Sequence, residues 1–268
     1  MSQADRYTRY ERLKFDWPHP RVLRIRLDNG KMNTADHRMH RELAQIWIDV
    51  DADPEVNAVI VTGNDRVFSA GGDFAMVDDL LNDAQARARG WKEARAIVYN
   101  IINCNKPIIS AMRGVAVGAG LVVGVLADIS IATKDCRIID GHTRLGVAAG
   151  DHAAIIWPLL VGMHRAKEYL MTGEPVLGPA AAAMGLVNRC VPDDALDAEV
   201  DAMAQKLRAL PPYAVSRTKM ALNLANRHMT GAACETSHAW ELHSFTTQDF
   251  QEATRAFVEK RPGVYTGR

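Results

Sequence analysis

A histidine and an aspartate that could together move a proton lie in the stretch GHTRLGVAAGDHAAIIWPLLVG, residues 141–162. His142 precedes Asp151, and a Gly-containing turn separates them. A neutral imidazole has a pKa of about 6.5, so it can act as a base near neutral pH. A carboxylate nearby can fix its tautomer or hold a water molecule with it. The pair therefore indicates a site where His142 activates water.

The same residues also fit a purely structural interpretation. Asp is a preferred N-cap residue, so Asp151 fits the cap of a helix over residues 152–162. His142 taken alone fits an exposed loop histidine, and His152 is either the true base or simply the first helical residue. Pro158 lies inside this predicted helix, where we expect a kink or an early break. The pair by itself leaves catalysis and capping open.

Two Gly-rich turns are placed to present backbone amides to a ligand. The segment FSAGGD, residues 68–73, follows a buried strand, and RGVAVGAGL, residues 113–121, follows a second one. Amides at a helix N-terminus have no partner and carry partial positive charge. We therefore expect Gly72 and Ala119 to form an oxyanion hole, worth about 3–4 kcal/mol per donor in a transition state. The alternative is that both turns only allow close packing, because glycine clusters are weak signals.

The elements that must position these turns alternate along the chain. Strand and helix patterns alternate over residues 22–140, and helical patterns dominate after residue 151. This order is typical of an α/β fold with a helical C-terminal part. The apolar, Gly- and Ala-rich segment 115–127 fits a fully enclosed helix. The segments 76–104 and 213–259 also carry helical patterns.

Composition argues against several classes of protein. The 268 residues contain 32 Lys and Arg against 32 Asp and Glu, with no basic run, so we expect no nucleic-acid partner. No stretch of about 18 apolar residues occurs, so we expect no membrane span and a cytoplasmic location. The four cysteines are scattered, and the pair His37 and His40 lacks a third ligand. We therefore predict no metal site.

Four further segments occur in a recognisable order and spacing. They are NKPIISAMRGVAVGAGLVVGVLADISIAT, GMHRAKEYLMTGE, AAAMGLVNRCVPDDAL and FVEKRPGVY. With the preceding VNAVIVTG and FSAGGDF, the chain resembles the crotonase (enoyl-CoA hydratase/isomerase) superfamily over nearly its whole length. The resemblance implies an α/β crotonase (ClpP-like) fold, with a spiral of ββα units over residues 1–200. It also implies a helical trimerisation region over residues 201–268 and a homotrimer, or a hexamer made of two trimers.

The resemblance further implies an acyl-CoA substrate and no separate cofactor, because coenzyme A is part of the substrate. It assigns the two oxyanion-hole amides to Gly72 and Ala119. The Ala70 carbonyl is expected to meet the adenine, Lys31 the CoA phosphates, and Lys260 the CoA of a neighbouring subunit. As bare residues, the two lysines also fit solvated surface charges. The residues expected to contact the substrate or its CoA are Lys31, Met32, Thr34, Ala70, Gly71, Asp73, Phe74, Val122 and Lys260.

The hydratase pattern breaks at two positions. The resembling hydratases use two glutamates, and the corresponding positions here are Val122 and His142. Val122 cannot carry a proton, so hydration by two glutamates cannot operate in this chain. The pair His142 and Asp151 instead resembles the one in carbon–carbon hydrolases of the superfamily, of oxocamphor hydrolase and β-diketone hydrolase type, where it activates water for a retro-Claisen cleavage. His40 and Glu241 match those hydrolases more loosely.

Three functions are compatible with these residues. The leading one is an enoyl-CoA hydratase-like enzyme in which Gly72 and Ala119 polarise the thioester and His142, oriented by Asp151, activates water. The second is a hydrolase of a β-diketone C–C bond, CoA-linked or free; such hydrolases use another histidine near the second turn, where this chain has only Gly, Ala and Leu. The third is a catalytically silent scaffold or RNA-binding protein. Neutral net charge argues against RNA, and the small residues at both turns argue against a silent site.

Overall fold

The buried apolar runs of the sequence form the strands of two sheets in the computed structural model, which describes residues 6–268, apart from the side chains of 225–232. The larger sheet has the strand order β1-β2-β3-β5-β7-β10, and the smaller has the order β4-β6-β8-β9. Pairing is parallel except between β1 and β2 and between β8 and β9. The strands are β1 (Leu13–His19), β2 (Val22–Leu27), β3 (Ala58–Thr62), β4 (Ser69–Ala70), β5 (Ile108–Met112), β6 (Val115–Val117), β7 (Ile129–Thr133), β8 (Arg137–Ile139), β9 (Val176–Leu177) and β10 (Arg189–Val191).

A ββα unit recurs along the chain. After each of β3, β5 and β7 in the larger sheet, the chain enters β4, β6 or β8 of the smaller sheet and then turns helical. This recurrence confirms the predicted α/β crotonase fold. The helices are α1 (His37–Ala52), α2 (Phe74–Asn82), α3 (Ala84–Asn103), α4 (Gly118–Leu126), η2 (Thr143–Leu145), α5 (His152–Val161), α6 (Met163–Thr172), α7 (Gly178–Met184), η3 (Asp193–Ala195), α8 (Leu196–Arg208), α9 (Pro212–Ser244) and α10 (Gln248–Glu259).

Three long segments with helical patterns differ from the expectation. Two are each divided into two helices, and the third begins as a strand. The segment 76–104 forms α2 and α3, because Asp83 ends the first helix and caps the second through the amide of Gln85. The segment 115–127 begins as strand β6, since Val115–Val117 pairs with two neighbouring strands before α4 starts. The segment 213–259 is divided into α9 and α10, and the Thr247 side chain caps α10.

Helices cover the larger sheet on both faces. Strand residues alternate between two apolar clusters, with Val59 and Val61 in one and Ile60 in the other. This alternation is expected for a parallel sheet buried on both sides. Helix α8 supplies Leu196 and Val200 to the cluster around Ile60. Because α8 spans residue 200 while packing on this sheet, the division between 1–200 and 201–268 stays a prediction.

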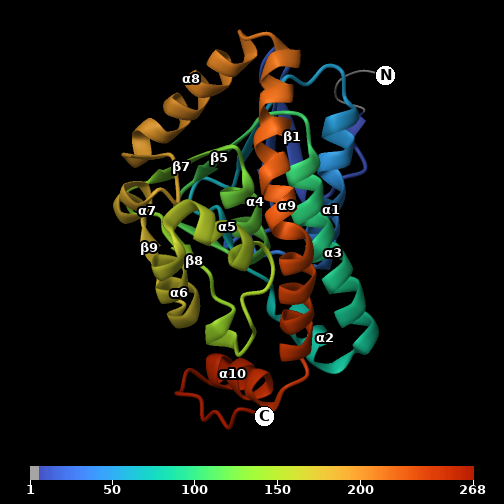
Figure 1. Ribbon diagram of the computed structural model, residues 1–268, viewed down its shortest axis with the longest axis vertical. Coiled ribbons are helices and arrows are strands. Elements are labelled where there is room, and N and C mark those ends of the chain that lie inside the picture. Colours follow the sequence, from blue (N-terminus) through green and yellow to red (C-terminus); the bar gives the residue numbers. More distant parts are fainter. Residues whose placement is uncertain (1–5) are drawn as a thin grey trace.

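The long helix α9 connects the two ends of the molecule. Figure 1 shows α8 at one end, α10 with the C-terminus at the other, and α9 running between them. Helix α9 packs against α3 and α5, and α10 packs against η2. The segment after β8 is therefore enclosed by the C-terminal helices. Across the described residues, no helix combines the length and apolar character that a membrane crossing requires.

The second cluster provides a test of the fold. Ile109 in β5 has no exposed surface and lies under α8, so Ile109→Ala should lower the free energy of unfolding by about 2–5 kcal/mol through lost burial and a cavity. Ile48 in α1 is 50% exposed, so Ile48→Ala should change it by about 0.5 kcal/mol. Urea unfolding of both variants measures the difference. Similar losses in the two variants would contradict the described covering of the sheet.

Candidate active site

The carboxyl ends of three parallel strands meet at one edge of the smaller sheet. In the register, Ala70 of β4 pairs with Val117 of β6, and Val117 pairs with Ile139 of β8. The chain leaves these strands through Gly71–Gly72, Gly118–Ala119 and Asp140–His142 in turn. Adjacent parallel strands deliver the residues that follow them to the same side. The two Gly-rich turns and the predicted catalytic histidine are therefore neighbours.

The two Gly-rich turns approach each other more closely than side chains would allow. A Cβ atom on Gly118 would lie 2.9 Å from the Gly71 Cα and 3.4 Å from the Gly72 nitrogen. Gly118 also has a φ of +58°, in the left-handed region that favours glycine. Gly141 lies beside the same strand, since its Cβ would contact Val117 Cγ1 at 3.7 Å. Glycine at 118 is what brings both turns together.

Gly72 and Ala119 each direct a backbone N–H away from the surrounding ladders. The Ala35 amide donates to the Gly71 carbonyl at 2.7 Å and the Asp73 amide donates to the Ala35 carbonyl at 3.0 Å, so the Gly72 N–H faces the opposite side. Ala119 is the second residue of α4, where an amide has no acceptor within the helix. The α4 dipole adds positive potential at the same point. This pair of amides is suited to hold an oxyanion.

His142 is held by a carboxylate that the sequence analysis did not single out. Its Nδ1 lies 3.0 and 3.2 Å from the two carboxylate oxygens of Asp140, and its backbone N–H also donates to Asp140 at 3.4 Å. Asp140 is buried, directly after strand β8. This contact fixes the ring and leaves Nε2 for chemistry. The orienting role that was expected of Asp151 is therefore filled by Asp140.

The other ring nitrogen of His142 faces two acidic side chains. Nε2 lies 4.0 Å from Asp151 Oδ2 and 3.9 Å from Glu241 Oε1 of α9. Both distances exceed a hydrogen bond and suit a small polar molecule held between the groups. Asp151 is also the N-cap of α5, because Oδ1 accepts from the Ala153 amide at 3.2 Å. The Asp151 carboxylate therefore caps α5 and also lies near His142.

Helix α9 is pinned against the turn that carries Asp151. A Cβ on Gly150 would lie 2.1 Å from the Ser237 carbonyl oxygen and 2.7 Å from Glu241 Cβ, so only glycine permits this approach. The Ser237 hydroxyl donates to the Gly150 carbonyl, and the Ala148 amide donates to the Ser244 hydroxyl at 3.1 Å. These contacts fix Glu241 beside Nε2 of His142.

The burial of several acids beside one imidazole shifts their proton affinities. Burial opposes the charge on His142, but the carboxylates of Asp140 and Asp151 outweigh it and raise its pKa well above the usual value. Burial and the charge of Asp151 raise the pKa of Glu241 to about 8, although His142 opposes the shift. The pKa of Asp151 is lowered despite its burial, because His152 and His142 stabilise the anion. At neutral pH, His142 is therefore cationic, Asp151 anionic and Glu241 a neutral acid.

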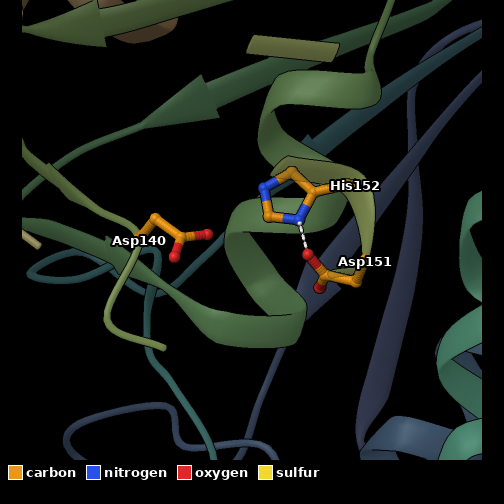
Figure 2. Close-up of side chains that lie close together, drawn as sticks. All are labelled: Asp140, Asp151 and His152. Carbon is orange, nitrogen blue, oxygen red and sulfur yellow. Dashed lines mark hydrogen bonds and ion pairs between the residues drawn. The ribbon is translucent and has the colours of Figure 1, made fainter. Parts of the chain in front are cut away.

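Asp140, Asp151 and His152 form a tight cluster at the centre of the site. Figure 2 shows the His152 ring between the two carboxylates, with its Nδ1 bonded to Asp151 at 2.7 Å. One ligand atom from each of the three lies within 4.8 Å of the others, a spacing that a metal ion could use. Asp140 already accepts from His142 and Asp151 from His152, so the paired arrangement favours proton chemistry over metal binding.

Several residues predicted to contact CoA surround the Gly-rich turn. Lys31, Met32 and Phe74 are exposed, whereas Val122 is buried in the main core. Asp73 shapes the loop as the N-cap of α2, accepting from the Met76 amide at 2.8 Å. Thr34, Ala70 and Gly71 lie in or beside the same loops, where the Ala70 amide donates to the Met32 carbonyl at 3.1 Å.

Two predicted site residues, Lys260 and His40, lie at the end of α10 and in α1. Lys260 ends α10 in a left-handed conformation, and the neighbouring Phe257 contacts Phe74 with ring centroids 5.7 Å apart. The end of α10 thus contacts the start of α2 in its own chain. His40 is buried in α1, and its Nδ1 bonds Glu93 of α3 at 2.9 Å. His40 therefore joins α1 to α3 and makes its hydrogen bond away from the residues around His142.

Comparison with known proteins places these features in a family. The family described as enoyl-CoA hydratase/isomerase matches residues 19–268. A carnitinyl-CoA dehydratase from Citrobacter koseri is 28% identical, with 100% of each chain covered. A solved enoyl-CoA hydratase/isomerase from Mycobacterium paratuberculosis is 32% identical with a TM-score of 0.87, covering 91% of this chain and 97% of that one. A solved β-diketone hydrolase from the cyanobacterium Anabaena is 25% identical with a TM-score of 0.85, covering 92% and 98%.

The fold and the paired Gly-rich turns therefore define a crotonase-type α/β protein. The chain belongs to the enoyl-CoA hydratase/isomerase family, which confirms the resemblance inferred from its motifs. The β-diketone hydrolase was solved bound to (S)-3-oxocyclohexyl acetic acid, so in that protein the same fold binds a molecule with a ring ketone.

The raised pKa of Glu241 predicts a pH-dependent loss of stability. Between about pH 4.5 and 8, the folded protein keeps a proton on Glu241 that the unfolded chain releases, so the free energy of unfolding falls as the pH rises. Glu241→Gln removes the titratable proton and with it this pH dependence. Relative to wild type, its free energy of unfolding should increase from pH 5 to pH 9 by at least about 1.4 kcal/mol, the equivalent of one pKa unit.

Urea unfolding at several pH values measures this difference. Glu168→Gln provides the control, because Glu168 is exposed on α6 and its substitution should leave the pH dependence unchanged. Parallel pH profiles for wild type and Glu241→Gln would show that Glu241 ionises normally in the folded protein.

Proposed function

We propose that this protein is an enoyl-CoA hydratase-like enzyme that adds water to an acyl-CoA thioester. The observation that carries the proposal is the convergence of three strand ends, which puts the amides of Gly72 and Ala119 beside the segment bearing His142. The amides would hold the thioester oxygen as negative charge develops on it. The family membership and the hydratase and dehydratase names of relatives support the same class of reaction.

The reacting water would be held among Nε2 of His142, Oδ2 of Asp151 and Oε1 of Glu241. Its oxygen bonds to C3 of the enoyl thioester, and the C2=C3 electron pair moves to the thioester oxygen, where the two amides stabilise the enolate. Because His142 is already cationic, the Asp151 carboxylate takes the proton of the water, which the imidazolium holds beside it, and neutral Glu241 gives a proton to C2. Return of a proton from the pair to Glu241, whose Oε1 lies 3.9 Å from Nε2, restores the starting state.

Coenzyme A would be recognised at the loops before α1 and α2. We assign Lys31 to the CoA phosphates and the Ala70 carbonyl to the adenine. Exposed Met32 and Phe74 border this region, so both can contact the thioester arm. We assign Lys260 to the CoA of a neighbouring subunit; because the end of α10 contacts the start of α2, the CoA of its own subunit is the alternative.

A carbon–carbon hydrolase is the second candidate. It is favoured by His142 and Val122 at the positions of the two expected glutamates and by the likeness to the β-diketone hydrolase. In that reaction water adds to one carbonyl of a β-diketone and the bond to the central carbon breaks. The electron pair moves into the enolate of the second carbonyl, and a proton on the central carbon completes the ketone and the carboxylic acid. The same oxyanion hole and His142–Asp151 pair would serve it.

The two reactions can be separated by their products. We expect crotonyl-CoA incubated with the enzyme in ¹⁸O-water to gain one labelled water with its carbon chain intact. A CoA ester of a cyclic β-diketone and the free diketone form the second and third arms, and fragmentation spectra distinguish a hydrated ketone from a ring-opened acid of equal mass. A ring-opened acid without hydration of any enoyl thioester would favour the hydrolase. No turnover in any arm would favour a silent scaffold and contradict both enzymes.

The catalytic pair gives a prediction on rates. His142→Ala and Asp151→Asn should each lower kcat at least about 100-fold, the usual range for a general acid–base group. His164→Ala is the control, because His164 is exposed on α6 and should retain wild-type turnover. Steady-state kinetics on the best substrate of the preceding experiment provide the measurement. Wild-type kcat in both site variants would remove His142 and Asp151 from the mechanism.

We also propose that the chain assembles as a homotrimer, or as a hexamer of two trimers. Large apolar side chains are exposed on the two C-terminal helices: Leu222, Leu224, Trp240, Phe257 and Val258. Large apolar side chains left exposed on these helices are candidates for contacts between chains. Light scattering after size-exclusion chromatography should give three or six times the chain mass of 29.5 kDa. A mass of one chain at micromolar concentration would contradict this assembly.

A further inference from the structure

A second histidine lies behind Asp151 and has no role in the reaction proposed above. His152 is the first residue of α5 and has no exposed surface. It is polar, whereas most of α5, with the sequence HAAIIWPLLV, is apolar. Burying an imidazole is unfavourable unless its nitrogens are used. One of them is used, because Nδ1 bonds Oδ1 of Asp151 at 2.7 Å.

The contact with His152 decides which oxygen of Asp151 faces the reaction. Oδ1 accepts from His152 Nδ1 and from the Ala153 amide at 3.2 Å. These two donors on one oxygen fix the carboxylate, and they leave Oδ2 as the atom nearest His142, 4.0 Å from Nε2. The Ala153 amide alone would satisfy an N-cap, so helix capping does not account for a buried imidazole here.

The opposite edge of the His152 ring faces the carboxylate that holds His142. Figure 2 shows this edge directed toward Asp140, and Nε2 is buried without a hydrogen-bond partner in the described part of the chain. Asp140 in turn accepts from His142 Nδ1. Two carboxylates and two imidazoles therefore alternate around one cluster, and His152 is the member with the smallest exposed fraction.

We propose that His152 is a positioning residue, which acts through Asp151 by keeping this carboxylate ionised with Oδ2 directed at His142. The inference rests on the proposed function in one respect, that His142 and Asp151 form the acid–base pair. The lowered pKa of Asp151 agrees with it, since burial opposes the anion and the neighbouring His152, which donates to it, favours it together with His142. The other titratable groups facing the pair are Asp140 and His142 after β8, and Cys234, His238 and Glu241 on α9.

Two substitutions separate hydrogen bonding from packing. His152→Asn keeps an N–H donor near the position of Nδ1, whereas His152→Phe keeps the ring volume without a donor. In His152→Phe, we expect the pKa of His142 to fall by about one unit, because the neighbouring anion is lost or turned away. We expect kcat to fall at least about 10-fold, with KM within about threefold of wild type. His152→Asn should keep both quantities within about threefold and about 0.3 units.

NMR titration of ¹⁵N-histidine-labelled protein gives the pKa of His142, and kinetics give kcat and KM. His152→Gln supplies a second donor-displaced variant if His152→Phe does not fold, because its amide reaches the Nε2 position rather than Nδ1; it should behave like His152→Phe. His37→Phe is the control, since it removes a histidine–aspartate contact of 2.8 Å on the surface of α1 and should leave the His142 titration unchanged.

Two outcomes would overturn the inference. In the first, His152→Phe and His152→Gln keep the wild-type His142 titration and kcat. In the second, His152→Asn loses as much as His152→Phe, which would mean that His152 only fills space. The titration needs no substrate, so it decides the role of His152 even if the wild-type protein hydrates no thioester. A wild-type protein inactive in every arm of the product experiment would instead contradict the proposed function.

Discussion

Two carboxylates, Asp140 and Asp151, are buried within reach of the His142 imidazole, and the chemistry of the site depends on this placement. A buried charge needs a partner of opposite sign or a set of hydrogen bonds. His142 supplies a positive charge to both carboxylates, which is why its pKa rises in spite of burial. A third buried acid at full charge would be repelled by these two carboxylates. Glu241 is accordingly neutral at pH 7, and the site gains a proton donor.

The fold meets this constraint with short elements and close backbone contacts. Strands β4, β6 and β8 contain only two or three residues each, yet their parallel register puts an amide, a second amide and an acid at one edge. Gly118 lets the two amide-bearing turns meet, and Gly150 lets α9 approach the turn before α5. Neither glycine carries chemistry of its own. Each determines how near the chemical groups come to one another.

The sequence predicted those parts of the site that depend on local order. Gly72 and Ala119 follow strands and precede or begin helices, a pattern visible within about ten residues of chain. Their role as an oxyanion hole stays a prediction. Asp140 was missed because it reads as the end of the strand CRIID, although an acid two residues before the histidine was a usable signal. Glu241 lies on a distant helix, and only resemblance drew attention to it. The division of two helical segments at Asp83 and at Thr247 depends on side-chain caps that periodicity does not register.

Helix α9 joins the interior of the site to the outside of the molecule. Glu241 is buried beside Nε2 of His142, while its neighbour Trp240 is 66% exposed on the same helix. A rigid helix moves as a unit, so a displacement of one face also moves the other. The close contacts at Gly150 couple α9 to the turn that carries Asp151. The distance between Glu241 and the His142 ring therefore depends on the position of α9, whose opposite face is exposed at Trp240. In this protein, the exposed face of α9 and the tuning of a buried acid belong to one helix.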